Sequence, residues 1–132
     1  MTGLESSREE TKKYKMDCRT ILGLSPNIRY VGIINRFGRT LVGQLRKDVT
    51  PLFKTDEARN EFFIEATRNQ LRKNFESSIG RTEYTFTENE KVKILTLSNE
   101  TNNFYYITFD KDTTSQDVGT IIGMIKRLAG KD

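Results

Sequence analysis

The glycine-containing stretch over residues 29–47 is the part of the chain whose residue types come closest to a phosphate-binding site. A P-loop holds phosphate with the backbone N–H groups of G-x-x-x-x-G-K-[ST], between a strand and a helix. Gly38 and Gly43 have that gap, but glutamine and leucine follow where the motif needs lysine and serine or threonine. The stretch therefore does not predict a nucleotide site. We expect Gly32 and Gly43 to relieve crowding where a helix crosses the sheet.

Histidine is absent from the chain, and cysteine occurs once, at Cys18. Histidine is the commonest general base near neutral pH and the commonest zinc ligand, so this composition disfavours triad and transition-metal chemistry. The segment DKDTTSQD, at 110–117, is faintly similar to a calcium loop. It places serine and isoleucine where such a loop needs its sixth-position glycine and final glutamate. Cys18 falls on the apolar stripe of a predicted helix, which indicates a core residue. We expect no catalytic residue, metal or cofactor.

Five cationic side chains and no acidic one occur in residues 29–47, and Phe37 stands between two of the arginines. An exposed aromatic residue flanked by arginines has the composition of a binding hot spot, although Phe37 could equally pack back onto the first helix. The net charge of +4, from 22 Lys and Arg against 18 Asp and Glu, is small for a dedicated nucleic-acid binder. The candidate partner-binding residues are Arg36, Phe37, Arg39, Arg46 and Lys47.

Hydrophobic periodicity and turn signals predict the order helix, strand, strand, helix, three strands, helix. Strands 28–34 and 104–110 are apolar at nearly every position, which is typical of central strands covered on both faces. They come from opposite ends of the chain, and we expect them to pair. Strand 40–45 is more polar, as an edge strand is. The other predicted ranges are helix 8–22, helix 55–78, strands 82–88 and 91–98, and helix 115–129.

The long helix predicted over 55–78 carries two apolar stripes, whereas a helix that covers one sheet needs only one. At about 100° per residue, Ala58, Phe62, Ala66 and Phe63 form one stripe, and Ile64, Leu71 and Phe75 form the other. The charged residues Glu61, Glu65, Arg68 and Arg72 share a further arc. A second layer must therefore cover one stripe, either from this chain or from another molecule.

The predicted order of elements resembles the roadblock (dynein light chain, also MglB-like) family within the profilin-like and longin-like architectures. Its best local feature is the segment YVGIINRFGRTLVG, at 30–43. That family has a hydrophobic strand, a turn that ends in glycine and a second strand that leads to a long helix. An acidic residue or asparagine usually begins the turn. Asn35 fits this pattern, and Arg36 and Phe37 depart from it. The resemblance covers about residues 8–129. The chain also looks similar to a small archaeal protein family to which no activity is attached.

The resemblance to the roadblock family implies one α+β domain over 8–132 after a flexible start at 1–7. We expect a single five-stranded antiparallel sheet of order 2-1-5-4-3, with the long helix on one face and the two terminal helices on the other. Family members pair through the long helix and the third strand, bind small GTPases or serve as scaffolds, and are not generally catalysts. The dimer-interface candidates carried onto this chain are Ile64, Leu71, Phe75, Tyr84 and Phe86.

The leading prediction is therefore a non-enzymatic, homodimeric adaptor or regulator, with a small GTPase as one candidate partner. A first rival is a profilin-like sensor that holds a small molecule between sheet and helix. Another is a nucleic-acid or membrane-surface binder that uses the basic hairpin 29–47. The single cysteine and the polar N-terminal sequence, which has no apolar signal core, favour the cytoplasm.

Overall fold

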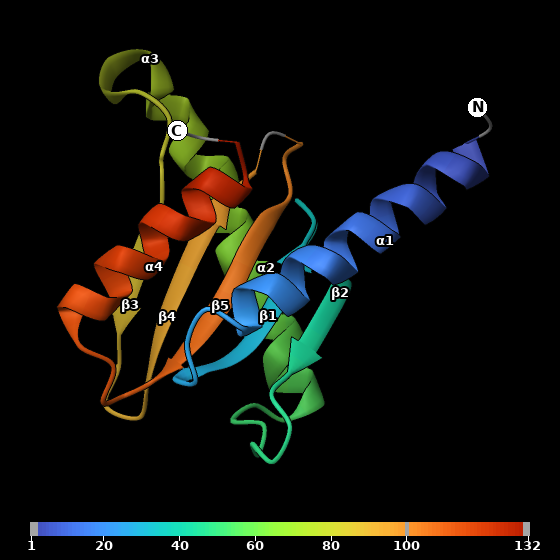
Figure 1. The fold of residues 1–132 in the computed structure, drawn as a ribbon. Coiled ribbons are helices and arrows are strands. Elements are labelled where there is room, and N and C mark those ends of the chain that lie inside the picture. Colours follow the sequence, from blue (N-terminus) through green and yellow to red (C-terminus); the bar gives the residue numbers. More distant parts are fainter. Residues whose placement is uncertain (1–2, 100, 131–132) are drawn as a thin grey trace.

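The computed structural model describes residues 3–99 and 101–130, without the side chains of residues 3–6. The chain forms three layers, with α1 and α4 on one face of a sheet and α2 on the other (Figure 1). In chain order the elements are α1 (Gly3–Leu22), β1 (Ile28–Ile34), β2 (Thr40–Leu45), α2 (Thr55–Arg72), the 3₁₀ turn η1 (Lys73–Phe75), α3 (Glu76–Ile79), β3 (Thr85–Glu88), β4 (Val92–Ser98), β5 (Phe104–Asp110) and α4 (Ser115–Leu128).

The sheet has five antiparallel strands in the order β2-β1-β5-β4-β3, as the sequence predicts. The two strands with apolar residues throughout, β1 and β5, pair at its centre, with Val31 opposite Ile107. Both are covered by helices, which explains why they lack alternation. The more polar β2 lies at one edge. The predicted architecture and element order are therefore confirmed.

Two apolar clusters, one on each face of the sheet, hold the layers together. Cys18 of α1 is fully buried in the larger cluster with Ile125 of α4 and the central strand residue Ile107. The smaller cluster lies under α2, where the ring of Phe62 meets the edge of Tyr106 at 4.9 Å between centroids. Edge-to-face contact is a favoured geometry for aromatic pairs. Cys18 is therefore a core residue, as predicted.

Three boundaries differ from the predicted ones by more than one residue. The first helix begins at Gly3, not at residue 8, because no helix breaker follows that glycine before Gly23. The flexibility predicted for residues 1–7 stays a prediction, and residues 1–2 lie outside the described part of the chain. The third strand begins at Thr85, not at residue 82, because residues 80–84 run from α3 to the sheet edge (Figure 1). The long helix is regular only to Arg72 and continues as η1 and α3.

The two glycines that face each other in β1 and β2 make room for a side chain. Gly32 pairs with Gly43, and a Cβ at Gly32 would stand 2.8 Å from the hydroxyl oxygen of Tyr30. The ring of Tyr30 stacks on Phe62 with 6.4 Å between centroids. The glycines relieve crowding, as predicted, but the crowding comes from the ring of Tyr30 and not from a helix that crosses the sheet.

Within the described residues, no helix is long and apolar enough to cross a bilayer.

Candidate functional site

Large apolar side chains project from α2 on the side opposite the sheet. Phe63, Ile64, Leu71 and Phe75 are 50–60% exposed, although a soluble helix normally presents polar residues there. With Thr67 they line one open groove of about 480 Å³, and Arg68 and Arg72 complete its wall. We call Phe63, Ile64, Thr67 and Leu71 of α2, together with Phe75 of η1, which continues the helix, the outer face of α2.

The register of α2 follows from how its first turn is fixed and from what it packs on. The backbone N–H of Lys54 donates to Oε1 of Glu57 at 3.0 Å, and Glu57 lies where the helix dipole favours a negative charge. Phe62 and Ala66 then face the sheet and are buried. The structure thus shows that Ile64, Leu71 and Phe75 form the exposed stripe. Phe63, which the periodicity grouped with the inner stripe, joins them because it is 60% exposed.

The groove on the outer face of α2 is apolar at its centre and cationic along one side. The guanidinium of Arg72 stacks over the ring of Phe75 at 5.1 Å from the centroid. Arg68 lies 3.4 Å from Oε1 of Glu65. Aromatic and aliphatic side chains bordered by arginine are the usual composition of a protein-binding surface. The arrangement is suited to binding another protein.

The turn at 35–39 stands beside one end of this face. The side-chain oxygen of Asn35 accepts hydrogen bonds from the backbone N–H groups of Phe37, at 2.9 Å, and Arg39, at 3.0 Å. Phe37 is 65% exposed and carries the guanidinium of Arg36 over its ring at 4.8 Å. It therefore does not pack onto the first helix. The turn presents Arg36, Phe37 and Arg39 to solvent.

Arg46 differs from the other predicted partner-binding residues because its guanidinium points inward. It donates to the backbone oxygens of Ile28 (2.6 Å), Ser25 (2.7 Å) and Leu22, at the end of α1. Arg29 is likewise engaged, with Oδ1 of Asp110 at 3.0 Å. Lys47 is exposed. The five cations of the hairpin therefore do not form one surface, and Arg46 serves the fold.

The five dimer-interface candidates fall on two sides of the molecule. Ile64, Leu71 and Phe75 share the outer face of α2. Phe86, in β3, instead packs against the cluster under α1 and α4. Tyr84 lies two residues before it, just outside the strand, and Lys126 of α4 stands 5.4 Å from the centre of its ring. Strand alternation places Phe86 on the face of β3 away from α2 and Thr87 on the face toward it, where Thr87 lines a cavity with Glu65 and Arg68 of α2.

Two carboxylates on the sheet-facing flank of α2 have buried surroundings that the sequence did not reveal. The hydroxyl of Tyr106 donates to Oε2 of Glu61 at 2.6 Å. Glu65 is only 5% exposed, and its Oε2 has no hydrogen-bond partner among the described residues. Burial raises the pKa of Glu65, the nearby Arg68 charge lowers it and Glu61 raises it. The charged arc predicted for α2 is therefore partly internal.

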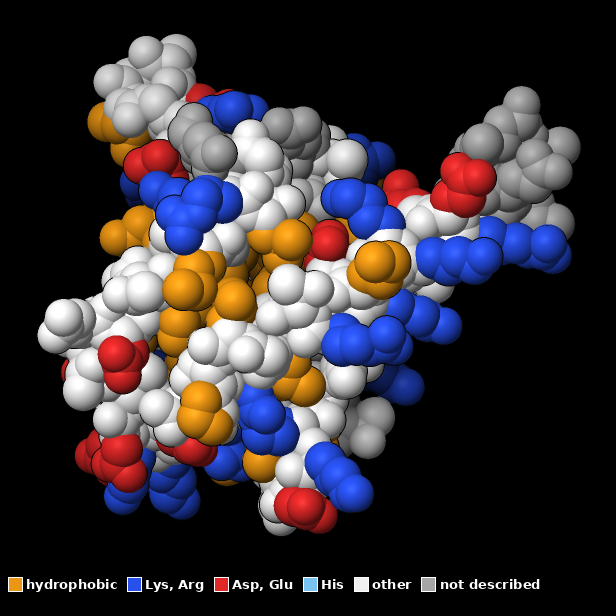
Figure 2. Space-filling view, viewed as in Figure 1, with side chains coloured by type: hydrophobic (Ala, Val, Ile, Leu, Met, Phe, Trp, Pro, Cys, Tyr) orange, Lys and Arg blue, Asp and Glu red, His pale blue; other side chains and the backbone are white. Residues whose placement is uncertain are grey.

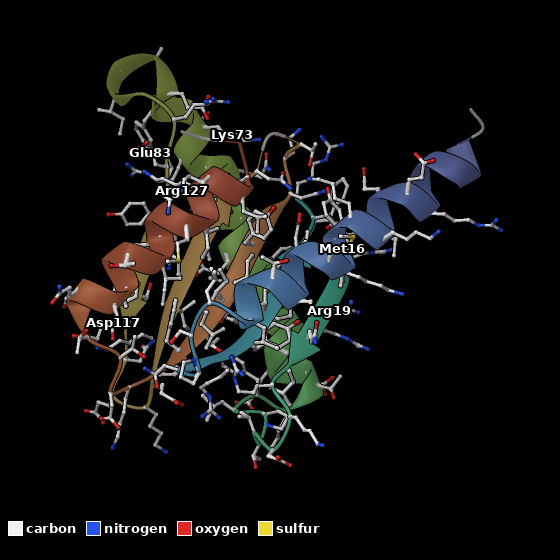
Figure 3. The ribbon with its side chains drawn as sticks, in the orientation of Figure 1. Met16, Arg19, Lys73, Glu83, Asp117 and Arg127 are labelled. Carbon is white, nitrogen blue, oxygen red and sulfur yellow. The ribbon has the colours of Figure 1, made fainter. Side chains whose placement is uncertain are left out.

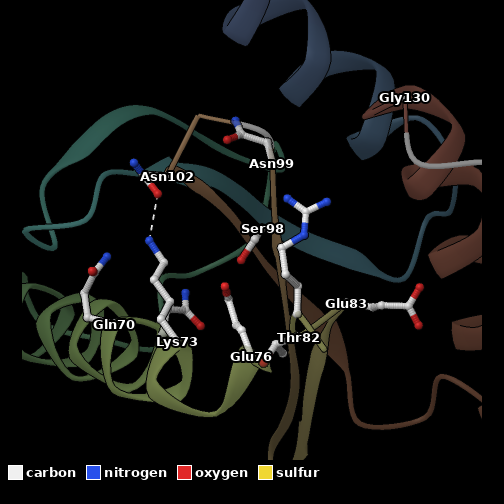
Figure 4. Close-up of a pocket in the computed structure, with 11 residues that line it drawn as sticks. Gln70, Lys73, Glu76, Thr82, Glu83, Ser98, Asn99, Asn102 and Gly130 are labelled. Atoms are coloured by element: carbon white, nitrogen blue, oxygen red, sulfur yellow. Dashed lines mark hydrogen bonds between the residues drawn. The ribbon is translucent and has the colours of Figure 1, made fainter. Parts of the chain in front are cut away.

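A polar cavity of about 490 Å³ lies where the end of α2, the α3–β3 linker and the β4–β5 turn meet (Figure 4). Lys73 donates to the side-chain oxygen of Asn102 at 2.7 Å within it. Its wall mixes cations, Lys73 and Arg81, with the carboxylates of Glu76 and Glu83. Because both signs of charge line the wall, the cavity has no clear preference for an anionic or a cationic ligand.

A smaller, largely apolar cavity of about 140 Å³ lies between the sheet and the start of α2, against Tyr30, Phe53 and Phe62. Sites for drug-sized molecules usually enclose about 300–1,000 Å³. This volume does not favour the sensor alternative, which needs a ligand between sheet and helix.

The architecture is that of roadblock/LC7 domains, and comparison with solved structures shows the same fold. The chain superposes on a roadblock/LC7 domain from Streptomyces avermitilis with a TM-score of 0.63 and 8% identity, covering 85% of this chain and 90% of that one. It matches MglB of Myxococcus xanthus with a TM-score of 0.71 and 15% identity, over 93% and 89% of the two chains. The gliding protein MglB of Thermus thermophilus gives 0.67 and 12%, over 92% and 91%.

No protein-family model and no curated protein sequence matches this chain. The roadblock-like fold predicted from the element order and the 30–43 segment is thus confirmed by structure, at sequence identities of 8–15%. The similarity to an archaeal family receives no support.

Proposed function

We propose that this protein is a non-enzymatic adaptor or regulator that forms a homodimer through the outer face of α2. The observation that carries the proposal is the exposure of Phe63, Ile64, Leu71 and Phe75 on one helix face. A contiguous exposed apolar patch of this kind usually marks a binding site. The helix has 18 residues and is therefore about 27 Å long, enough for two antiparallel copies to pack along their length.

Structural similarity to proteins of the same fold supports the proposed self-association. One of them, MglB with a tetrameric arrangement, matches with a TM-score of 0.67 and 13% identity, over 90% of this chain and 91% of that one. Two copies paired across a twofold axis would place Leu71 and Ile64 of each against the other. β3 is the outermost strand at its end of the sheet and lines a cavity with α2 through Thr87, so its free edge would extend the contact.

Solution mass measured by light scattering over a dilution series tests the dimer. We expect the wild-type chain to have the mass of a dimer at about 100 µM. Leu71→Glu should give a folded monomer, because a buried unpaired charge strongly opposes association. Met16→Glu is the matched control, since Met16 is also an exposed apolar helical residue, at 64% against 59% for Leu71, but lies on α1. A monomeric wild type, or a Leu71→Glu dimer, would refute the proposed interface.

We propose that the regulated partner is a small GTPase in the cytoplasm, and that the protein binds it through the turn at 35–39. The exposed Phe37 with Arg36 stacked on it supplies an aromatic and cationic contact beside the outer face of α2. Small GTPases from the same genome, loaded with GDP or a GTP analogue, should bind the wild type and bind Phe37→Ser weakly. Equal binding by Phe37→Ser, with the dimer intact, would remove the turn from the partner surface.

A further inference from the structure

One flank of α1 carries a row of four cations at helical spacing, Arg8, Lys12, Lys15 and Arg19. The steps of four, three and four residues keep them within an arc of about 60°. All four are exposed, and the row extends about 16 Å along the helix. We call these four residues the basic flank of α1. The four-three-four spacing is present in the sequence itself.

The acidic residues in the described part of α1 lie outside the basic flank. In the described part of α1, Glu9, Glu10 and Asp17 lie elsewhere on the helix, and Lys13 pairs with Asp17 at 3.6 Å. Among the described side chains, none of the four cations has a carboxylate within ion-pair distance. Figure 2 shows Lys and Arg side chains along one side of α1 and acidic ones along the other. The separation leaves a continuous positive strip.

The basic flank runs beside an open sheet edge. α1 contacts β2, the outermost strand at its end of the sheet, and no described strand pairs with the outer edge of β2. Thr40, Leu41, Gly43 and Leu45 of this strand are exposed. Figure 3 shows Arg19 extending from α1 on the side of β2. Unpaired backbone N–H and C=O groups therefore lie close to unpaired cations.

We propose that the edge of β2 and the basic flank of α1 together bind an extended acidic segment of a partner protein, which adds to the sheet as a sixth strand. A strand added there would lie about 4.8 Å from β2 and satisfy its free backbone groups. Every second side chain of that segment would then face the α1 layer, where carboxylates meet Lys15 and Arg19. The part of α1 that projects past the sheet would meet residues beyond the added strand (Figure 1).

A strand edge distinguishes this occupant from other polyanions. Nucleic acid and anionic lipid carry negative charge that would complement the cations, but neither has a peptide backbone that can pair with β2. The site lies on the side of the sheet away from the outer face of α2, so it does not depend on the proposed dimer. The Leu71→Glu monomer should still bind the acidic segment. Failure of the dimer proposal can therefore be distinguished from failure of this one.

The test uses a fluorescent ten-residue peptide in which glutamate alternates with threonine, titrated into the full chain. One control peptide has glutamine for glutamate, and another keeps the glutamates but has proline for two central threonines. We expect the acidic peptide to bind about tenfold more tightly than either control, because the controls lack the charge or the backbone donors. Amide NMR shifts should change in residues 40–45.

Charge reversal provides the second arm. The double variant Lys12→Glu, Lys15→Glu should lose about tenfold or more in affinity, whereas Lys13→Glu, an adjacent cation outside the flank, should bind nearly as the wild type. Equal binding of the proline peptide, or tighter binding of single-stranded DNA or phosphatidylserine vesicles, would overturn the proposal. The proposal would also be overturned if the double variant and the Lys13→Glu variant bound the acidic peptide with equal affinity. The cations of the flank would then only protect the edge of β2 from aggregation.

Discussion

Gly38 lies directly against the backbone of Phe63, so that a Cβ on Gly38 would stand 2.8 Å from the Cα of Phe63. The contact joins the β1–β2 turn to the middle of α2, although the two residues are distant in sequence. Gly38 also has a φ of +85°, which glycine adopts at no steric cost. One glycine therefore permits both the turn and its approach to the helix, and it places Phe37 beside the outer face of α2.

We predict that Gly38→Ala lowers the free energy of unfolding by about 2–4 kcal/mol, the sum of a left-handed backbone penalty and a backbone overlap. Gly130→Ala is the matched control. Gly130 also has a positive φ, +73°, but nothing lies within 4 Å of its added Cβ. It should cost only about 1 kcal/mol. Urea unfolding of both variants gives the difference, and equal losses would mean that the turn is not pressed against α2.

Arg46 donates hydrogen bonds to three backbone oxygens between the end of α1 and the start of β1. Arg46→Met keeps the apolar stem but removes the donors to Leu22, Ser25 and Ile28. We expect a loss of about 2–4 kcal/mol in unfolding free energy, since three part-buried acceptors lose a charged donor. Lys47→Met changes the neighbouring exposed cation and should stay within about 0.5 kcal/mol of the wild type. A similar effect of both substitutions in urea unfolding would contradict this role.

The sequence predicted the fold well because the burial of β1 and β5 appears in their composition. It could not show what each cation does. Arg46 and Lys47 are adjacent and chemically alike, yet only the tertiary path of the chain from Leu22 to Ile28 brings carbonyl groups to Arg46. The second stripe of α2 was visible from periodicity, but its direction depends on which residues meet Tyr106. Phe63 and Glu65 were misplaced because each lies at the margin of its arc.

Cys18 should be inert in the folded protein. Burial and then the charge of Asp17 raise its pKa to about 12, and the side chain has no exposed surface. At about pH 8 a thiol reagent should label it only as fast as the protein unfolds, because the thiolate is the reactive form. Met16→Cys adds a matched thiol at a 64% exposed site, which should label at once. Rapid labelling of Cys18 without denaturant would show that α1 detaches from the sheet.

The last prediction concerns the buried carboxyl of Glu65, whose pKa is raised in the folded state, chiefly by burial. The native chain then binds this proton more tightly than the unfolded chain. Stability therefore falls as the pH rises through the window between the unfolded value, about 4.3, and the raised native value. Relative to Glu65→Gln, which cannot ionise, the wild type should lose unfolding free energy as the pH rises above about 4. Glu90→Gln, at an exposed turn, is the matched control for the substitution itself. If the wild type instead gained stability relative to Glu65→Gln over that range, the nearby Arg68 would outweigh burial, and Glu65 would be held ionised in the folded protein.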